Sequence, residues 1–263
     1  MTDEEGALWA WGRSRFGQLG LGSAFSHEAQ AQQVPGVERV QSFSLGWGHA
    51  AAVVSGALCL TRALLLMTAD HSKLADSRST QLLTWGFPKH GRLGHSFGAH
   101  ADADAEAEAS VLGRCVPAAA PVQLPAGFEP REVRAGLDHT LVLAADGRVA
   151  SFGDDSLRQL GRPLVSYAAG DQDAEAWVLR DWDGAALRVS QIACGLAHSL
   201  AITRESRVVC WGWNAAGALG DASPSPNGLH CMDFEGYMLQ DGWTPGEGLR
   251  VWGAGDLRHA SAR

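Results

Sequence analysis

The sequence lacks the features that define several protein classes. Its five cysteines form no C-x-x-C pair, and an odd number of cysteines fits reduced thiols better than a disulfide framework. The acidic start, MTDEEG, has no apolar core of a signal peptide. The longest apolar run, ALCLTRALLLMTA, is interrupted by Arg62 and is too short to span a bilayer. We therefore expect a cytoplasmic or nuclear protein without a membrane partner.

Positive charge is also scarce. The 263 residues carry a formal net charge of −8, and 19 of the 21 basic residues are arginine. Proteins that bind nucleic acid usually present a basic footprint to the phosphate backbone. The charge therefore argues against a nucleic-acid partner.

The motifs of common catalytic and cofactor sites are missing as well. No glycine-rich loop ends in the Lys-Ser/Thr pair of a P-loop, and no G-x-S-x-G elbow is present. The glycine-rich stretches also lack the strand–turn–helix context of a dinucleotide site. We expect no enzyme, and no catalytic, cofactor-binding or metal-binding residues.

Glycine and tryptophan are abundant, at 32 and 10 residues, and they belong to a repeated motif. Four copies, WGRSRFGQLG, WGFPKHGRLG, FGDDSLRQLG and WGWNAAGALG, begin at residues 11, 85, 152 and 211. In the third copy Phe152 replaces the tryptophan, and Arg158 stands where the others have glycine. Such internal repetition is typical of repeat architectures.

A second motif alternates with the first. GWGH, GLDH and GLAH end at His49, His139 and His198, and GDLRH, ending at His259, is a looser copy. In two copies the next aromatic residue stands 13 positions after the histidine. Both intervals predict a β-hairpin, with a strong turn at Asp146-Gly147 and weaker turn chemistry at Glu205-Ser206.

We interpret the two motifs as a structural signature. The aromatic residues are expected to wedge between units, the glycines to permit turns and close approach, and the leucines to anchor those turns. The histidines are expected to bond backbone at turns and not a metal, because their copies lie in different units. The signature residues are Trp11, Gly12, Gly17, Leu19, Gly20, Gly46, His49, Trp85, Gly86, Gly91, Leu93, Gly94, Gly136, His139, Phe152, Gly153, Leu160, Gly161, Gly195, His198, Trp211, Gly212, Gly217, Leu219 and Gly220.

A β-rich unit repeated in this way predicts an all-β propeller with blades of four antiparallel strands. ALWAWGRSRFGQLGLG with GWGHAAAVVSG, and IACGLAHSLAI with VVCWGWNAAGALGD, resemble repeats of the regulator of chromosome condensation (RCC1) family. The resemblance implies a seven-bladed ring, of which four repeats are detectable here. We expect a single domain over 1–263 with repeats starting near 6, 81, 147 and 207.

The ring is expected to be incomplete. A truncated or mispredicted chain, a smaller ring and an open arc are the three explanations, and the first is favoured because an open arc leaves faces unpaired. Insertions are expected at 57–80, 97–116 and 165–183. The first interrupts a hairpin, either as an inserted loop or as a retained intron, because its removal joins AAVVSG to QLLTWG.

The resemblance implies a non-enzymatic module for protein–protein interaction. Its expected partners are proteins, among them a small GTPase whose nucleotide exchange it would regulate. The alternative is a tryptophan-based sensor like the ultraviolet-B photoreceptor of the same family. GWGHA comes close to that photoreceptor's motif, but Gly48 stands where the motif has arginine, and Trp47 has no counterpart at Leu137 or Leu196.

Overall fold

The computed structural model describes most of the repeat motifs. The described residues are 1–24, 26–56, 79–95, 115–161, 176–180, 185–214, 218–219 and 250–252. Gly217, Gly220 and His259 lie outside them, as do residues 57–78, 97–114, 165–175 and 181–183 of the expected insertions. At the edges of those insertions, Thr80, Val116 and Trp177–Val178 belong to strands.

The described chain is built from antiparallel sheets, which we call blades 1 to 4. The only described helix is the short 3-10 helix η3 (Lys89–Gly91), and no described helix is long and apolar enough to cross a membrane. Blade 1 pairs β1 (Trp9–Ser14) with β2 (Ser26–Gln33); blade 2 has β3 (Val40–Leu45), β4 (His49–Ser55), β5 (Thr80–Gly86) and β6 (Val116–Pro121); blade 3 has β7 (Pro130–Ala135), β8 (His139–Ala144), β9 (Val149–Gly153) and β10 (Trp177–Val178); blade 4 has β11 (Val189–Cys194), β12 (His198–Thr203), β13 (Val208–Gly212) and β14 (Arg250–Trp252).

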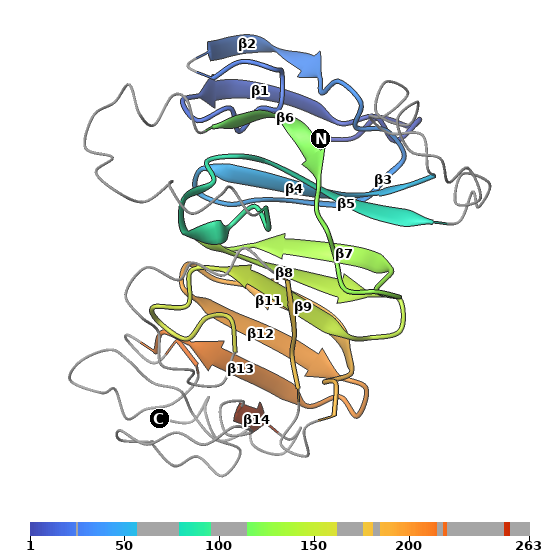
Figure 1. Cartoon of the computed structure of the whole chain (residues 1–263), viewed down its shortest axis with the longest axis vertical. Coiled ribbons are helices and arrows are strands. Elements are labelled where there is room, and N and C mark those ends of the chain that lie inside the picture. Colours follow the sequence, from blue (N-terminus) through green and yellow to red (C-terminus); the bar gives the residue numbers. More distant parts are fainter. Residues whose placement is uncertain are drawn as a thin grey trace, which may run out of the picture.

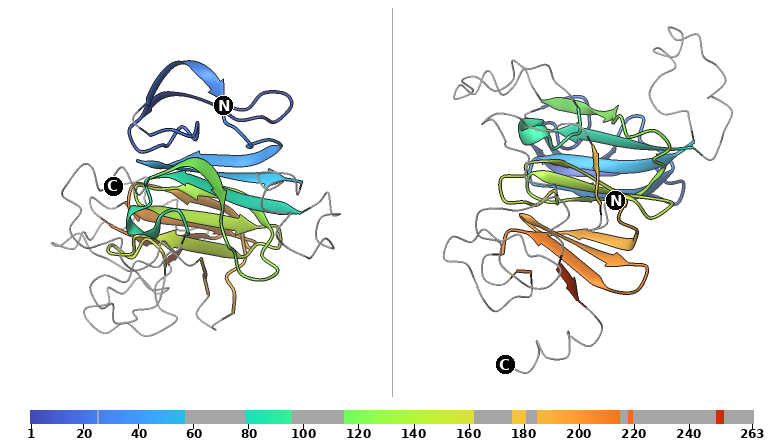
Figure 2. Two further views of the ribbon diagram at one scale, coloured as in Figure 1. Left: turned by 45° about the horizontal axis from the view of Figure 1, so that its top comes forward. Right: turned by 60° about the horizontal axis from the view of Figure 1, so that its bottom comes forward.

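The blades stack face to face in chain order, as in part of a propeller. Figure 1 shows blade 1 at the top and blade 4 at the bottom, and the left view of Figure 2 shows blade 1 at the top again. The predicted all-β propeller with antiparallel blades is confirmed. Within the described residues blade 1 has two strands instead of the expected four.

The predicted hairpins are confirmed, and they share one register. His139 pairs with Gly153, and His198 pairs with Gly212. Gly147 occupies the turn with a φ of 93°, and Ser206 takes the equivalent place with a φ of 62°. In blade 2 the same register pairs His49 with Gly86, and the pairing continues to Ser55 and Thr80.

The core consists of one apolar cluster between each pair of neighbouring blades. Strand β4 serves two of these clusters, because Ala50 and Ala52 face blade 1 whereas Ala51 and Val53 face blade 3. All four are fully buried. A sheet covered on both faces explains why HAAAVV reads as a continuous apolar run instead of an alternating one.

The motif aromatic on the third strand of each complete blade packs against the preceding blade. Trp85, Phe152 and Trp211 are at most 1% exposed. Trp11 is 50% exposed, so the prediction that it is a packing residue needs correction. Within the described residues no blade precedes blade 1, and the indole has no neighbouring blade to cover it.

This difference predicts unequal effects for one substitution at two equivalent positions. Trp211→Ala should lower the free energy of unfolding by about 3–5 kcal/mol, because it empties a fully buried site. Trp11→Ala should cost less than about 1 kcal/mol, as is usual for surface positions. Urea denaturation followed by circular dichroism measures both, with the milder Trp211→Phe as a further variant. Equal losses at the two positions would contradict the assignment.

Candidate functional site

We call the contact between two neighbouring blades a joint. The hydrogen bonds of each joint meet at the backbone carbonyl of the residue before the Leu-Gly turn. The Trp85 indole Nε1 in blade 2 donates to Gln18 O in blade 1 at 3.0 Å. The Trp211 Nε1 in blade 4 donates to Gln159 O in blade 3 at 2.9 Å. The indole therefore contributes a directed hydrogen bond as well as buried apolar area.

A histidine and a hydroxyl continue this network across the same joints. His139 Nε2 lies 3.0 Å from the hydroxyl of Ser199 in the next blade, and that hydroxyl donates to Gln159 O at 2.8 Å. The single hydroxyl proton is thereby used, so Nε2 must carry the proton that joins histidine and serine. His49 and Thr140 repeat the arrangement at 3.0 Å, and Thr140 also donates to a backbone carbonyl.

The role expected for the histidines therefore needs correction. They were expected to bond backbone at a turn, yet His49 and His139 bond side-chain hydroxyls of the following blade. The expectation missed this because the partner lies 91 residues away for His49 and 60 residues away for His139. The signal present in the sequence is the hydroxyl residue directly after His139 and His198.

Burial keeps these imidazoles neutral. Desolvation lowers the pKa of His49 to about 3, with the charge of Arg92 and the neighbouring His139 adding to the effect. Desolvation likewise lowers the pKa of His139 to about 4, with His198 contributing. Since the neutral imidazole donates through Nε2, the joints keep their hydrogen bonds at physiological pH.

The lowered pKa values predict how stability depends on pH. Below pH 6.5 the unfolded chain binds protons on both histidines, whereas the folded chain does not until about pH 4 and pH 3. The free energy of unfolding should therefore be highest, as far as these two histidines are concerned, above pH 6.5. It should fall as the pH decreases towards 4, by about 1.4 kcal/mol per pH unit for each histidine. His139→Gln should remove about half of that slope in urea denaturation series at pH 7.5, 6 and 5. An unchanged slope would contradict this explanation.

Close approach of other atoms or a positive φ explains most of the motif glycines. A Cβ on Gly153, whose φ is 118°, would lie 2.4 Å from Asp138 O. A Cβ on Gly136 would lie 2.1 Å from the ring of His139. Positive φ is shared by the signature residues Gly12, Gly17, Gly20, Gly86, Gly91, Gly94, Gly153, Gly161 and Gly212. Arg158 adopts a φ of 63° at the position where other copies have glycine.

Most of the other described signature residues also take part in packing or in tight turns. The turn leucines are buried, and they are Leu19, Leu93, Leu160 and Leu219. Gly46 and Gly195, like Gly136, each donate their backbone N–H to the carbonyl of the histidine three residues later, at 2.9 and 2.8 Å. Because most of the repeated residues make contacts between blades, we expect the side chains that bind a partner at positions that differ between the copies.

Several positions that differ between copies meet at one end of the blades. We call this end the turn face, because it carries both the aromatic-Gly and the G-x-x-H turns. Phe16 of blade 1 stacks on Phe87 of blade 2 with ring centroids 4.6 Å apart, and it contacts Trp47 at 5.4 Å. Trp47 is 60% exposed. These three rings form what we call the aromatic shelf.

A buried ion pair holds the shelf in place. The Arg92 guanidinium of blade 2 lies 2.6 Å from the carboxylate of Asp138 in blade 3 and 5.2 Å from the centre of the Phe87 ring. Its Nε donates to Lys89 O at 2.7 Å. Desolvation lowers the pKa of Arg92, and the charge of Asp138 opposes that effect. Arg92 occupies the position of Gln159 in the next copy, so the pair is special to this joint.

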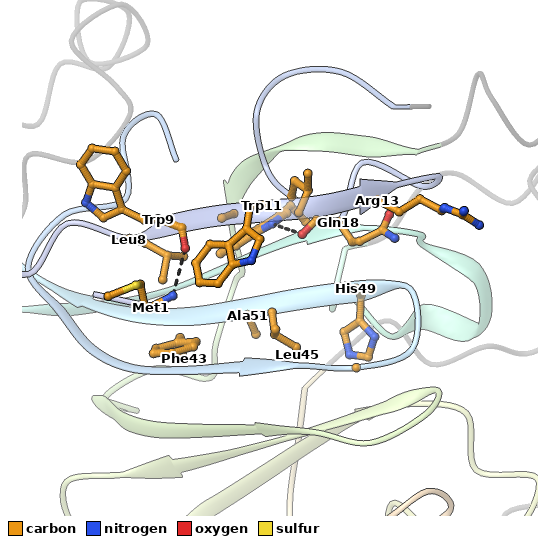
Figure 3. Close-up of a pocket in the computed structure, with 14 residues that line it drawn as sticks. Met1, Leu8, Trp9, Trp11, Arg13, Gln18, Phe43, Leu45, His49 and Ala51 are labelled. Atoms are coloured by element: carbon orange, nitrogen blue, oxygen red, sulfur yellow. Dashed lines mark hydrogen bonds between the residues drawn. The ribbon is translucent and has the colours of Figure 1, made fainter. Parts of the chain in front are cut away.

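A second exposed apolar region lies between blades 1 and 2. Figure 3 shows Trp11 extending from β1 towards Leu45 of β3 in a pocket that His49 also lines. Leu45 and Phe43 are 67% and 38% exposed, whereas Ile192, equivalent to Phe43 in blade 4, is only 4% exposed. The start of the chain also lies beside β1 here, with Met1 N donating to Trp9 O at 2.9 Å. The pocket, which Arg13 and Gln18 also line, is thus a partly covered contact between blades 1 and 2.

Comparisons with known proteins agree with this architecture. Residues 5–53 and 189–218 match models of the Regulator of chromosome condensation (RCC1) repeat. The Ultraviolet-B receptor UVR8 of Arabidopsis thaliana is 25% identical over 226 residues, which cover 82% of this chain and 39% of the receptor. The human RCC1-like G exchanging factor-like protein is 34% identical over 104 residues, which cover 40% of this chain and 22% of that protein.

A solved structure shows the same fold. The crystal structure of human WBSCR16 superposes with a TM-score of 0.60 at 21% identity, covering 90% of this chain and 52% of WBSCR16. The chain spans about half, or less, of the length of the curated relatives it matches. Similarity at this level shows a shared architecture. It does not show that this chain binds the partners of its relatives.

Proposed function

This chain is a member of the RCC1-like repeat family, and we propose on that basis that it is a non-enzymatic module that binds a protein partner through its turn face. The observation that carries the proposal is the aromatic shelf, where the exposed Trp47 contacts the half-buried Phe16, whose ring stacks on the half-buried Phe87. Exposed tryptophans in rigid surroundings are typical of the energetic centres of protein interfaces.

We expect the shelf to be rigid, because stacking and an ion pair hold two of its three rings. Phe16 and Phe87 stack, and the Arg92–Asp138 pair joins the turns of blades 2 and 3 under Phe87. A partner that covers Trp47 would therefore lose little side-chain entropy on this surface. Leu196, the residue equivalent to Trp47 in blade 4, is 62% exposed and extends the apolar surface along the same face.

The finer proposal is that the partner is a small GTPase and that binding promotes the release of its nucleotide. The similarity to the human RCC1-like G exchanging factor-like protein supports this choice. Nucleotide release needs binding and displacement but no covalent chemistry, so a docking surface is sufficient for it. We retain the cytoplasm or nucleus as the expected location, and 1–263 as one repeat domain.

A nucleotide-release assay tests the proposal. Purified chain should accelerate the release of fluorescent GDP from at least one member of a panel of small GTPases. Trp47→Ala should weaken binding to that GTPase about tenfold or more, because it removes the exposed centre of the shelf. Trp11→Ala is the matched control, since Trp11 is 50% exposed and lies outside the shelf. Equal effects of the two variants would reject the turn face, and no acceleration with any GTPase would reject exchange activity.

Light sensing is the second candidate, and Trp47 is also the observation that favours it. Its ring belongs to a cluster of aromatic side chains, and the ultraviolet-B receptor is among the relatives. If the chain senses ultraviolet-B light, irradiation should change its oligomeric state in size-exclusion chromatography. Trp47→Phe should abolish that change. An elution volume that irradiation leaves unaltered would remove this candidate.

A further inference from the structure

Three arginines converge at the end of the blades opposite the turn face. Arg148 follows the tip of the β8–β9 hairpin, Arg188 precedes β11, and Arg204 lies at the tip of the β12–β13 hairpin. All three contact Asp146, and we call these four residues the tip cluster. The cluster joins blade 3 to blade 4, and none of its members belongs to the repeat signature.

Asp146 organises the arginines through both its side chain and its backbone. Its carboxylate accepts from Arg148 Nε at 2.7 Å and lies 2.8 Å from Arg188 Nη1. Its backbone carbonyl accepts from Arg188 Nη1 at 3.1 Å and from Arg204 Nη2 at 2.6 Å. Burial raises the pKa of Asp146, but the bonds from Arg148 and Arg188 outweigh this and lower it to about 2. The centre of the cluster therefore stays ionised at physiological pH.

The cluster carries more positive than negative charge. Three guanidinium groups face one carboxylate, which leaves a surplus of two positive charges on a chain whose net charge is −8. The charged neighbours among the described residues leave this surplus in place. Exposed Glu205 and Arg207 offset each other beside Arg204, and Glu129 and Arg131 do so at the start of β7.

Donors of the cluster remain available to a ligand. Arg188 reaches Asp146 through Nη1, and Arg204 does so through Nη2, so each has other N–H groups directed elsewhere. Both side chains are exposed. Arg148 is anchored, because its guanidinium also bonds Gly127 O and lies 5.4 Å from the centre of the Phe128 ring. The planar guanidinium matches carboxylate oxygens in two-point contacts.

We propose that the tip cluster binds a carboxylate-rich peptide segment of a protein partner. Three guanidinium groups pre-arranged around one carboxylate suit a short run of Asp and Glu side chains that bond Arg188 and Arg204. The net charge of −8 on the whole chain disfavours a long polyanion such as a nucleic acid, whose binding needs an extended basic surface. The site lies away from the turn face, so this proposal stands whether or not the chain acts on a GTPase.

Fluorescence anisotropy with a labelled hexaglutamate peptide tests the proposal. The peptide should bind saturably in low salt, and the affinity should fall as salt is added. The double variant R188E/R204E should weaken binding about tenfold or more, because it reverses the two exposed charges. The matched control R13E/R15E makes the same change in net charge on exposed arginines of the turn face, and it should change the affinity less than about twofold.

Each other outcome overturns the proposal. No saturable binding of hexaglutamate would show that Asp146 satisfies the arginines alone. Equal weakening by the two double variants would show general attraction between charges and no defined site. Tighter binding of a single-stranded oligonucleotide of equal charge would assign the cluster to nucleic acid. Circular dichroism and thermal unfolding of each variant establish that it is folded before binding is measured.

Discussion

In each repeat that a described blade follows, the backbone carbonyl of the residue before the Leu-Gly turn accepts hydrogen bonds from the next blade. The stacking of the blades depends on these bonds. A donor from the next blade meets this oxygen in every described joint: an indole at Gln18, a hydroxyl at Arg92, and both at Gln159. The carbonyl is buried between blades, where an unpaired polar group would cost more than one exposed to water. Indole and hydroxyl can replace each other here, which explains how Phe152 is tolerated beside Thr140.

Repeated and unrepeated residues divide the work between stability and recognition. Most of the repeated residues hold neighbouring blades together, as the hydrogen bonds of His139 and Trp211 show. The unrepeated ones reach the surface at the two ends of the blades. One end presents aromatic rings around Trp47, and the other presents the guanidinium groups of Arg188 and Arg204. A partner that prefers apolar contact and one that prefers positive charge could therefore bind the same scaffold without competing.

The sequence predicted the features that local spacing determines. The hairpin from His139 to Gly153 follows from alternation and from the Asp146-Gly147 turn, and it is confirmed. Contacts between blades were beyond such reasoning, because their partners are distant in the chain. The hydroxyl partner of His49, the Arg92–Asp138 pair and the exposure of Trp11 all depend on which blade lies alongside. Comparing equivalent positions in the copies would have flagged Arg92, since the neighbouring copy has glutamine there.

The bonds across the joints have a direction. In the joint between blades 3 and 4, His139 of blade 3 donates to Ser199 of blade 4. In the opposite direction, the Ser199 hydroxyl and the Trp211 indole of blade 4 both donate to the backbone carbonyl of Gln159 in blade 3. The two sides of a blade are therefore chemically different, and each blade matches its neighbours only head to tail. A duplicated repeat would bring both halves of this contact with it. Growth of the array by tandem duplication would then preserve the joints while leaving the surface of each new blade free to diverge.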